Sequence, residues 1–158
     1  MQDKEKSVRV RFATTGGTLG SRSGHTVRTI TERQICDWLG EKNIAHRHAG
    51  EVFIVKAATN GSPMLFVPDI LLTKKTKDGR TIVIETLHNF SPKRGGLKTF
   101  AAFCKQFRDK YFTVLVAKKT TLASIPKGIC DARVELENLD TLSRKLGLGT
   151  RSPSARAA

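Results

Sequence analysis

Apolar residues follow a helical period in two stretches of the chain. In the first, they recur at spacings of three and four residues: Ile35, Trp38 and Leu39. Thr29 and Glu32 fit a capping box in front of this stretch, with Thr29 as the N-cap. The helix is expected to end from Gly40 onward. Residues 97–110 carry a similar apolar stripe. The pattern therefore predicts a helix after Thr29 and a second helix over 97–110.

Nearly continuous apolar runs predict the strands. They cover residues 8–12, 51–57, 65–73, 80–87, 111–117 and 134–136. Pro68-Asp69 interrupts the run at 65–73, and Lys77-Asp78-Gly79 separates it from the run at 80–87. We expect these two runs to pair as a hairpin. A closing helix is predicted over 138–146.

The resulting order is α-β-β-β-α-β, followed by a minor strand and a helix. A strand–helix–strand step after a hairpin favours an α/β domain with a mixed central sheet flanked by helices. The length of 158 residues suits one domain. We expect a basic flexible arm or loop over 1–28, the folded domain over 29–148 and a disordered tail over 149–158.

The charge balance points to a polyanionic partner. Lys and Arg number 28 against 14 Asp and Glu, so the formal net charge is +14. Residues 73–119 alone hold twelve basic residues against three acidic ones. Nucleic acid is the usual partner of such a chain. The candidate phosphate contacts are Lys74, Lys75, Lys77, Lys93, Arg94, Arg22 and Arg28.

Other features argue against a membrane protein, a secreted protein and a zinc protein. No apolar run reaches the roughly 18 residues of a membrane helix, and the N-terminus lacks the apolar region of a secretory signal. The three cysteines are widely spaced, which favours free thiols in a reducing, cytoplasmic setting. His46 and His48 would share one strand face, but nothing near them in sequence completes a tetrahedral set. We therefore expect a solvated strand edge there.

Two predicted strands each contain a carboxylate. Asp69 lies in FVPDILL and Glu85 in TIVIETL. A carboxylate in an apolar strand is costly unless it has a partner or a metal ion. Two on neighbouring strands would repel each other, and a divalent cation with a preference for oxygen ligands, such as Mg²⁺, would relieve the repulsion.

The arrangement of Glu32, Pro68-Asp69-Ile70 and Glu85 on a helix and two strands resembles the PD-(D/E)XK nuclease superfamily. Within it the chain is similar to archaeal Holliday-junction resolvases and small restriction-type endonucleases, over residues 32–117. The resemblance implies a restriction-endonuclease-like fold and an endonuclease that cuts DNA with Mg²⁺ or Mn²⁺. Asp69 and Glu85 would be metal ligands, and Glu32 would support the metal through water. It also implies a homodimer, since two sites cut two strands.

One position departs from this family pattern. Leu87 stands where the family has a lysine two residues after the glutamate. Three residues are candidate substitutes: Lys56 on an adjacent strand, Lys98 at the start of the next helix, and His88. A site that binds without cutting is a further alternative. The rival functions are thus a non-catalytic nucleic-acid-binding protein of the same fold and a basic RNA-associated factor of unrelated fold.

The proposed metal site depends on the register of the hairpin. A tight turn at Asp78-Gly79 would offset the carboxylates of Asp69 and Glu85 by roughly 10 Å. A wider loop over 75–79, or a bulge near Pro68, would place them opposite each other, with Cβ atoms about 5 Å apart. Three lysines within 74–77 disfavour a tight turn. We therefore predict the register in which Asp69 faces Glu85.

Overall fold

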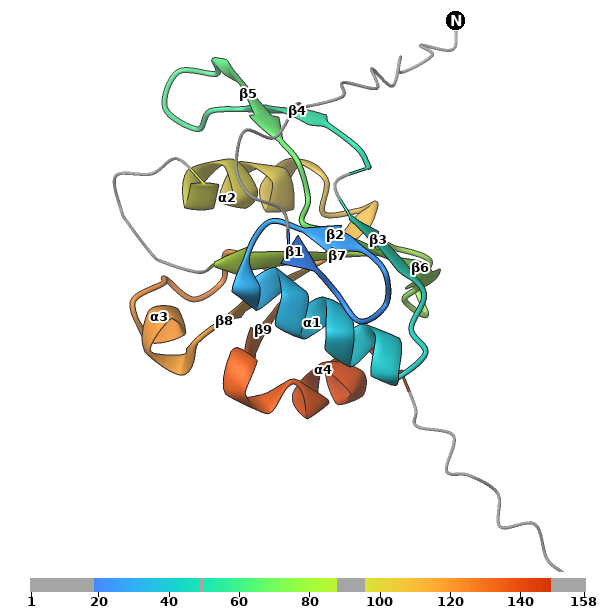
Figure 1. The fold of residues 1–158 in the computed structure, drawn as a ribbon. Coiled ribbons are helices and arrows are strands. Elements are labelled where there is room, and N and C mark those ends of the chain that lie inside the picture. The colour runs from blue at the N-terminus through green and yellow to red at the C-terminus, as the bar shows by residue number, and fades with distance from the viewer. Residues whose placement is uncertain (1–18, 49, 88–95, 149–158) are drawn as a thin grey trace, which may run out of the picture.

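A mixed five-stranded sheet lies at the centre of the computed structural model, which describes residues 19–48, 50–87 and 96–148 (Figure 1). The strand order within these residues is β3 (His46–His48), β6 (Ile70–Lys75), β7 (Thr81–Leu87), β8 (Tyr111–Ala117) and β9 (Ala132–Glu135). Neighbours from β3 to β7 are antiparallel, and β7, β8 and β9 are parallel. The prediction of an α/β chain with a mixed sheet is confirmed.

Each face of this sheet carries its own apolar core. Helices α1 (Ile30–Glu41) and α4 (Asp140–Lys145) cover one face, which includes the buried Ile70, Ile82 and Ile84. Helix α2 (Gly96–Gln106) and the short α3 (Lys119–Ala123) pack on the other. Strands buried on both faces read as continuous apolar runs. The segment Tyr111–Ala117 has this pattern, and its predicted bounds are those observed.

A separate two-stranded hairpin packs against α2. It pairs β4 (Phe53–Lys56) with β5 (Pro63–Phe66). The predicted strand at 51–57 therefore does not join the central sheet, and the predicted strand at 65–73 is two strands in two sheets. Pro68 cannot donate a ladder hydrogen bond and lies between them, which explains the break. The first strand of the central sheet is instead β3, the HRH segment.

Residues 19–27, predicted to belong to a flexible arm, form a small hairpin against α1. It consists of β1 (Leu19–Gly20) and β2 (Thr26–Val27), with Gly24 in the turn at a φ of 79°. The Arg22 N–H donates to Asp37 of α1 at 2.7 Å, and Val27 is buried. These contacts hold the hairpin on the helix that follows it.

The C-terminal part differs in detail from the predicted helix over 138–146. A 3₁₀ turn, η1 (Leu136–Asn138), precedes α4 there. Helix α3 was not predicted. The predicted strand at 8–12 and tail at 149–158 lie outside the described residues. None of the helices in the described part of the chain combines the length and apolar composition that a membrane span needs.

Candidate functional site

Two clusters of chemically active side chains lie side by side at the start of α1. The first contains the predicted carboxylates Asp69 and Glu85. The pairs Ile70↔Ile84 and Leu71↔Val83 set the register, and one further step places Asp69 opposite Glu85. The Asp69 N–H accordingly donates to Glu85 Oε2 at 3.3 Å. The predicted register is therefore observed.

The structural device that produces this register differs from the one expected. Near the turn, Lys75 pairs with Thr81, and a bulge between Leu71 and Lys75 shifts the register by two residues. We expected a wide loop or a bulge near Pro68 instead. A bulge adds residues to one strand and so changes which side chains face each other farther along it. The shift brings the two acidic residues together.

Asp69 is buried and held by three hydrogen bonds. Its Oδ2 accepts from the Thr86 N–H at 2.8 Å and from the Thr86 hydroxyl at 2.7 Å. Its Oδ1 accepts from Arg28 Nη2 at 2.8 Å. Burial raises the pKa of Asp69, and the nearby charge of Glu32 adds to this, although Thr86 and Arg28 oppose it. These hydrogen bonds therefore hold the carboxyl group in a buried position that disfavours its ionised form.

Glu85 is half-buried on β7, and its surroundings disfavour the ionised carboxylate more strongly than those of Asp69. Burial raises its pKa well above the usual range, and the charge of Asp69 raises it further. Asp69 and Arg28 offer only partial compensation, through the N–H hydrogen bond and the guanidinium charge respectively. Two neighbouring carboxyl groups whose pKa values are both raised form an arrangement that a bound cation would stabilise.

Glu32 links the acidic residues to the second cluster. Its N–H donates to the Thr29 hydroxyl at 3.1 Å, which confirms the predicted N-cap. One carboxylate oxygen accepts from the Arg28 N–H at 2.9 Å and the other contacts His48 Nδ1 at 2.8 Å. Burial would raise the pKa of Glu32, but these two hydrogen bonds and the charges of His48 and Arg28 outweigh it and lower the pKa.

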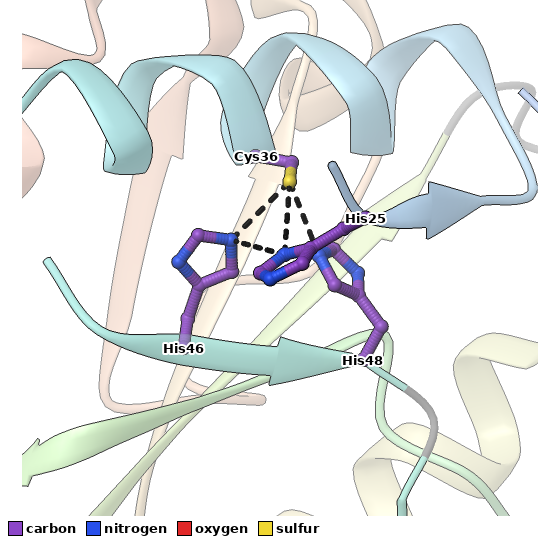
Figure 2. A group of neighbouring side chains, drawn as sticks. All are labelled: His25, Cys36, His46 and His48. Atoms are coloured by element: carbon purple, nitrogen blue, oxygen red, sulfur yellow. Dashed lines mark hydrogen bonds between the residues drawn. The ribbon is translucent and has the colours of Figure 1, made fainter. Parts of the chain in front are cut away.

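The second cluster consists of His25, Cys36, His46 and His48, whose candidate ligand atoms all lie within 4.8 Å of one another. Figure 2 shows Cys36 pointing from α1 toward the two histidines of β3, with His25 closing the group. The Cys36 Sγ lies 3.2 Å from His46 Nε2, 3.2 Å from His48 Nε2 and 3.5 Å from His25 Nδ1. The His25 and His46 nitrogens are 3.2 Å apart.

This cluster corrects the expectation that HRH is a solvated strand edge. β3 is indeed an edge strand, but His46 and His48 point toward α1 and are only partly exposed. Burial lowers the pKa of His46, and the positive charges that His48 and His25 would carry lower it further. A neutral imidazole is the form that binds a metal ion.

Sequence reasoning missed His25 and Cys36 because each comes from a different element. His25 ends the turn of the β1–β2 hairpin and Cys36 lies in the middle of α1. The available signal was density: three of the four histidines of the chain fall within residues 25–48. The other two cysteines are free thiols, as expected; burial raises the pKa of Cys104 to about 12 and also raises that of the half-buried Cys130.

The two predicted substitutes for the family lysine that lie in the described part of the chain form no hydrogen bond or ion pair with the acidic residues. Lys56 lies in β4, outside the central sheet, and its backbone pairs with Gln106 of α2. The expectation that it lies on an adjacent strand is wrong. Lys98 is exposed in the first turn of α2, and among the described residues it has no bond to Asp69 or Glu85. Arg28 is the cation that contacts Asp69.

Several predicted phosphate contacts also lie elsewhere. Lys74, Lys75 and Lys77 are exposed at the far end of the β6–β7 hairpin, about 20 Å along the strands from Asp69. Arg22 pairs with Glu41 at 3.3 Å on the surface. His88, Lys93 and Arg94 lie outside the described residues. Lys118 and Lys119 are described lysines at the end of the sheet toward which Glu85 lies, because they follow the last pair of β7 and β8, Leu87↔Ala117.

Comparisons with known proteins add no relative to these observations: no protein-family model, curated protein or solved structure matches the chain.

Proposed function

We propose that this chain is a DNA-binding, Mg²⁺-dependent endonuclease whose acidic site is formed by Asp69 and Glu85. The observation that carries the proposal is that these two carboxyl groups, each buried at least in part, lie on facing strands and both have a raised pKa, burial being the main cause in each case and the charge of Asp69 a further one for Glu85. Proteins retain such unfavourable pairs mainly where function needs them. Carboxylate oxygens are the ligands that Mg²⁺ and Mn²⁺ prefer.

The sheet topology supports the same proposal. Counting α1 and the strands of the central sheet with α2 between them gives the order α1-β3-β6-β7-α2-β8. This is the α-β-β-β-α-β order that the resemblance to the PD-(D/E)XK superfamily implies, with the β4–β5 hairpin inserted between its first two strands. We therefore propose a restriction-endonuclease-like fold, in which β3 is the first core strand.

Asp69 and Glu85 would hold the metal ion, and Glu32, which contacts neither by a hydrogen bond among the described residues, would act on it only at a distance. A bound Mg²⁺ would polarise a phosphate oxygen and lower the pKa of a water molecule. Glu85 Oε1 accepts no hydrogen bond within the described residues, so it is available to a ligand. Thr86 would keep the Asp69 carboxyl group oriented.

Arg28 would supply positive charge where the family lysine is missing. Its guanidinium contacts Asp69 Oδ1, and its charge lowers the pKa of both Asp69 and Glu85. Its side chain remains 46% exposed, so it can also reach a phosphate at the surface. The compensating positive charge would then come from the segment just before α1, whereas the family lysine would lie on β7.

The net charge of +14 supports a nucleic acid as the partner. At the sheet edge near Glu85, Lys118 and Lys119 are exposed and would contact the DNA backbone. A homodimer would allow both strands of a duplex to be cut, as the resemblance implies.

One observation favours a second candidate, a protein of the same fold that binds DNA without cutting it. Both oxygens of Asp69 already have partners, one from Thr86 and one from Arg28, and Leu87 replaces the lysine. In this alternative the Arg28–Asp69 ion pair would be permanent and would exclude the metal ion.

A cleavage assay separates the two candidates. The full chain is incubated with duplex, nicked and branched DNA across a Mg²⁺ titration, and Asp69→Asn and Glu85→Gln are compared with it. Even outer-shell changes at metal sites cost 10–100-fold, so each variant should lose more than about a hundredfold in rate. Asp109→Asn and Glu51→Gln, acidic residues outside the cluster, are the matched controls. Cleavage by both site variants at the wild-type rate would refute the site, and binding without any cleavage would favour the alternative.

A further inference from the structure

We propose that His25, Cys36, His46 and His48 bind one Zn²⁺ ion in a closed structural site, separate from the proposed Mg²⁺ site. Three imidazole nitrogens and one thiol sulfur meet at one point from three different elements (Figure 2). The inference does not depend on the proposed nuclease activity, because it stands on these four side chains and their partners.

Four of the six distances between the candidate ligand atoms are close to those of a tetrahedral zinc centre. With Zn–N of about 2.0 Å and Zn–S of about 2.3 Å, a regular tetrahedron has edges of about 3.3 Å between nitrogens and about 3.5 Å from nitrogen to sulfur. The observed N···N distance between His25 and His46 is 3.2 Å. The three distances from the Cys36 sulfur are 3.2, 3.2 and 3.5 Å. The two N···N distances from His48 to the other histidines are at most 4.8 Å, so a small adjustment of the His48 ring would complete a tetrahedral set around an ion.

The outer nitrogens of two histidines are engaged in the way that zinc ligands require. His46 Nδ1 contacts the Ile44 carbonyl at 2.8 Å, so it carries the proton and donates it. His48 Nδ1 contacts the buried Glu32 carboxylate at 2.8 Å and donates in the same way. In each ring the Nε2 atom then faces the cluster with its lone pair. A carboxylate or carbonyl behind a ligating histidine is the usual partner that orients it.

Cys36 has a comparable partner. The Ser23 hydroxyl lies 3.1 Å from the Cys36 sulfur and would donate to it once the thiol is deprotonated by the metal. Ser23 belongs to the same hairpin turn as His25, so one loop supplies both a ligand and a hydrogen bond to another ligand. Packing alone does not require that three candidate ligands each have a hydrogen-bond partner behind them.

The donor set identifies the metal and the type of site. One thiolate and three imidazoles suit Zn²⁺ and do not suit Mg²⁺, which prefers oxygen ligands. Four protein ligands leave no open position for water or substrate, which is typical of structural and not of catalytic zinc. The ion would therefore join elements together instead of taking part in hydrolysis.

Apart from α1, the elements it would join are very short strands. β1 and β2 have two residues each, and β3 has three and lies at the edge of the sheet. Strands this short are marginal without additional support. A zinc ion shared by the hairpin, α1 and β3 would supply it, because the binding energy of a structural zinc site stabilises the folded state.

The test is a metal analysis of the full-length chain, purified without chelators. We expect about one zinc per chain, and we expect Co²⁺ to replace it with the visible bands of a tetrahedral centre and a thiolate-to-cobalt charge-transfer band. Cys36→Ser and His46→Ala should lose the zinc, or bind it at least tenfold more weakly, and Cys36→Ser should lose the charge-transfer band. Cys130→Ser, which changes a described cysteine outside the cluster, should keep both.

Two results would overturn the proposal: the first needs no variant, and the second is taken only from variants whose circular dichroism matches that of the wild type. One is wild-type protein that contains no zinc and shows no charge-transfer band when titrated with Co²⁺. The other is zinc that disappears in Asp69→Asn or Glu85→Gln, because the ion would then belong to the acidic cluster. Loss of DNA cleavage with zinc retained would instead count against the proposed function alone.

Discussion

Replacing Glu85 by glutamine should stabilise the folded protein at neutral pH when no Mg²⁺ is present. Glu85 is half-buried, and burial together with the charge of Asp69 raises its pKa well above the usual range. The ionised form is therefore disfavoured in the folded state. Glutamine has the same shape, keeps an oxygen that accepts from the Asp69 N–H, and cannot ionise.

The effect has a definite dependence on pH. Below the unfolded-state pKa of Glu85 both states hold the proton, so the residue contributes nothing. As the pH rises above that value, the unfolded chain releases a proton that the folded chain retains, and the free energy of unfolding falls. The slope is at most about 1.4 kcal/mol per pH unit for one group. It ends where the pH reaches the raised folded-state pKa, and the whole loss persists above it.

Urea unfolding of the wild type and of Glu85→Gln, from pH 4 to pH 8, measures this slope. The buffers contain no added Mg²⁺ and no chelator, so that any zinc remains bound. The difference in unfolding free energy should grow with pH in favour of the variant, and added Mg²⁺ should narrow it by stabilising only the wild type. Glu51→Gln, which loses a surface ion pair with Arg47, should show no such growth. A variant that is less stable than the wild type at pH 8 without Mg²⁺ would refute the reasoning.

Three further predictions concern the metal, the pH and the DNA. Arg28→Ala should tighten Mg²⁺ binding measured by calorimetry, because it removes a positive charge from Asp69; weaker binding would mean that Arg28 positions the carboxylate. Mg²⁺-dependent cleavage should fall as the pH is lowered through the raised pKa values of Asp69 and Glu85, since their protonated forms bind metal poorly; a rate that rises toward acid would contradict this. Replacing Lys118 and Lys119 by glutamine should reduce the slope of log K against log salt by up to about 1.8 for any DNA sequence. Replacing Lys74 and Lys75 by glutamine, at the far end of the β6–β7 hairpin, is the control and should leave the slope of log K against log salt unaltered.

The sequence was most informative where a single element carried the whole signal. β8 is largely buried on both faces, so its seven residues are apolar or aromatic except for the buried Thr113, and its bounds are those predicted. The capping box at Thr29 and Glu32 depends only on residues three apart, and its N-cap is observed. The facing pair Asp69 and Glu85 was also predicted, but the bulge between Leu71 and Lys75 that produces it was not.

Features that depend on tertiary contacts could not be anticipated in this way. The run at 65–73 is apolar on both sides of Pro68-Asp69, and only the packing of β5 against α2 shows that its halves belong to different sheets. β3 has three polar residues and no apolar period, so nothing local marked it as a core strand. The Cys/His cluster is assembled from three elements, and sequence distance hides their proximity.

Both proposed sites depend on the same five residues, 28–32, at the start of α1. The Arg28 guanidinium binds Asp69 in the acidic site, and its N–H binds Glu32. Glu32 in turn binds His48 of the Cys/His cluster while capping the helix through Thr29. A metal ion that fixes His48 would therefore also fix Glu32 and, through the backbone of Arg28, the cation beside Asp69. Because the links are hydrogen bonds of 2.8–2.9 Å between partly buried groups, movement at either cluster would be transmitted to the other. The zinc proposed for one cluster would thereby help to position the charges of the other.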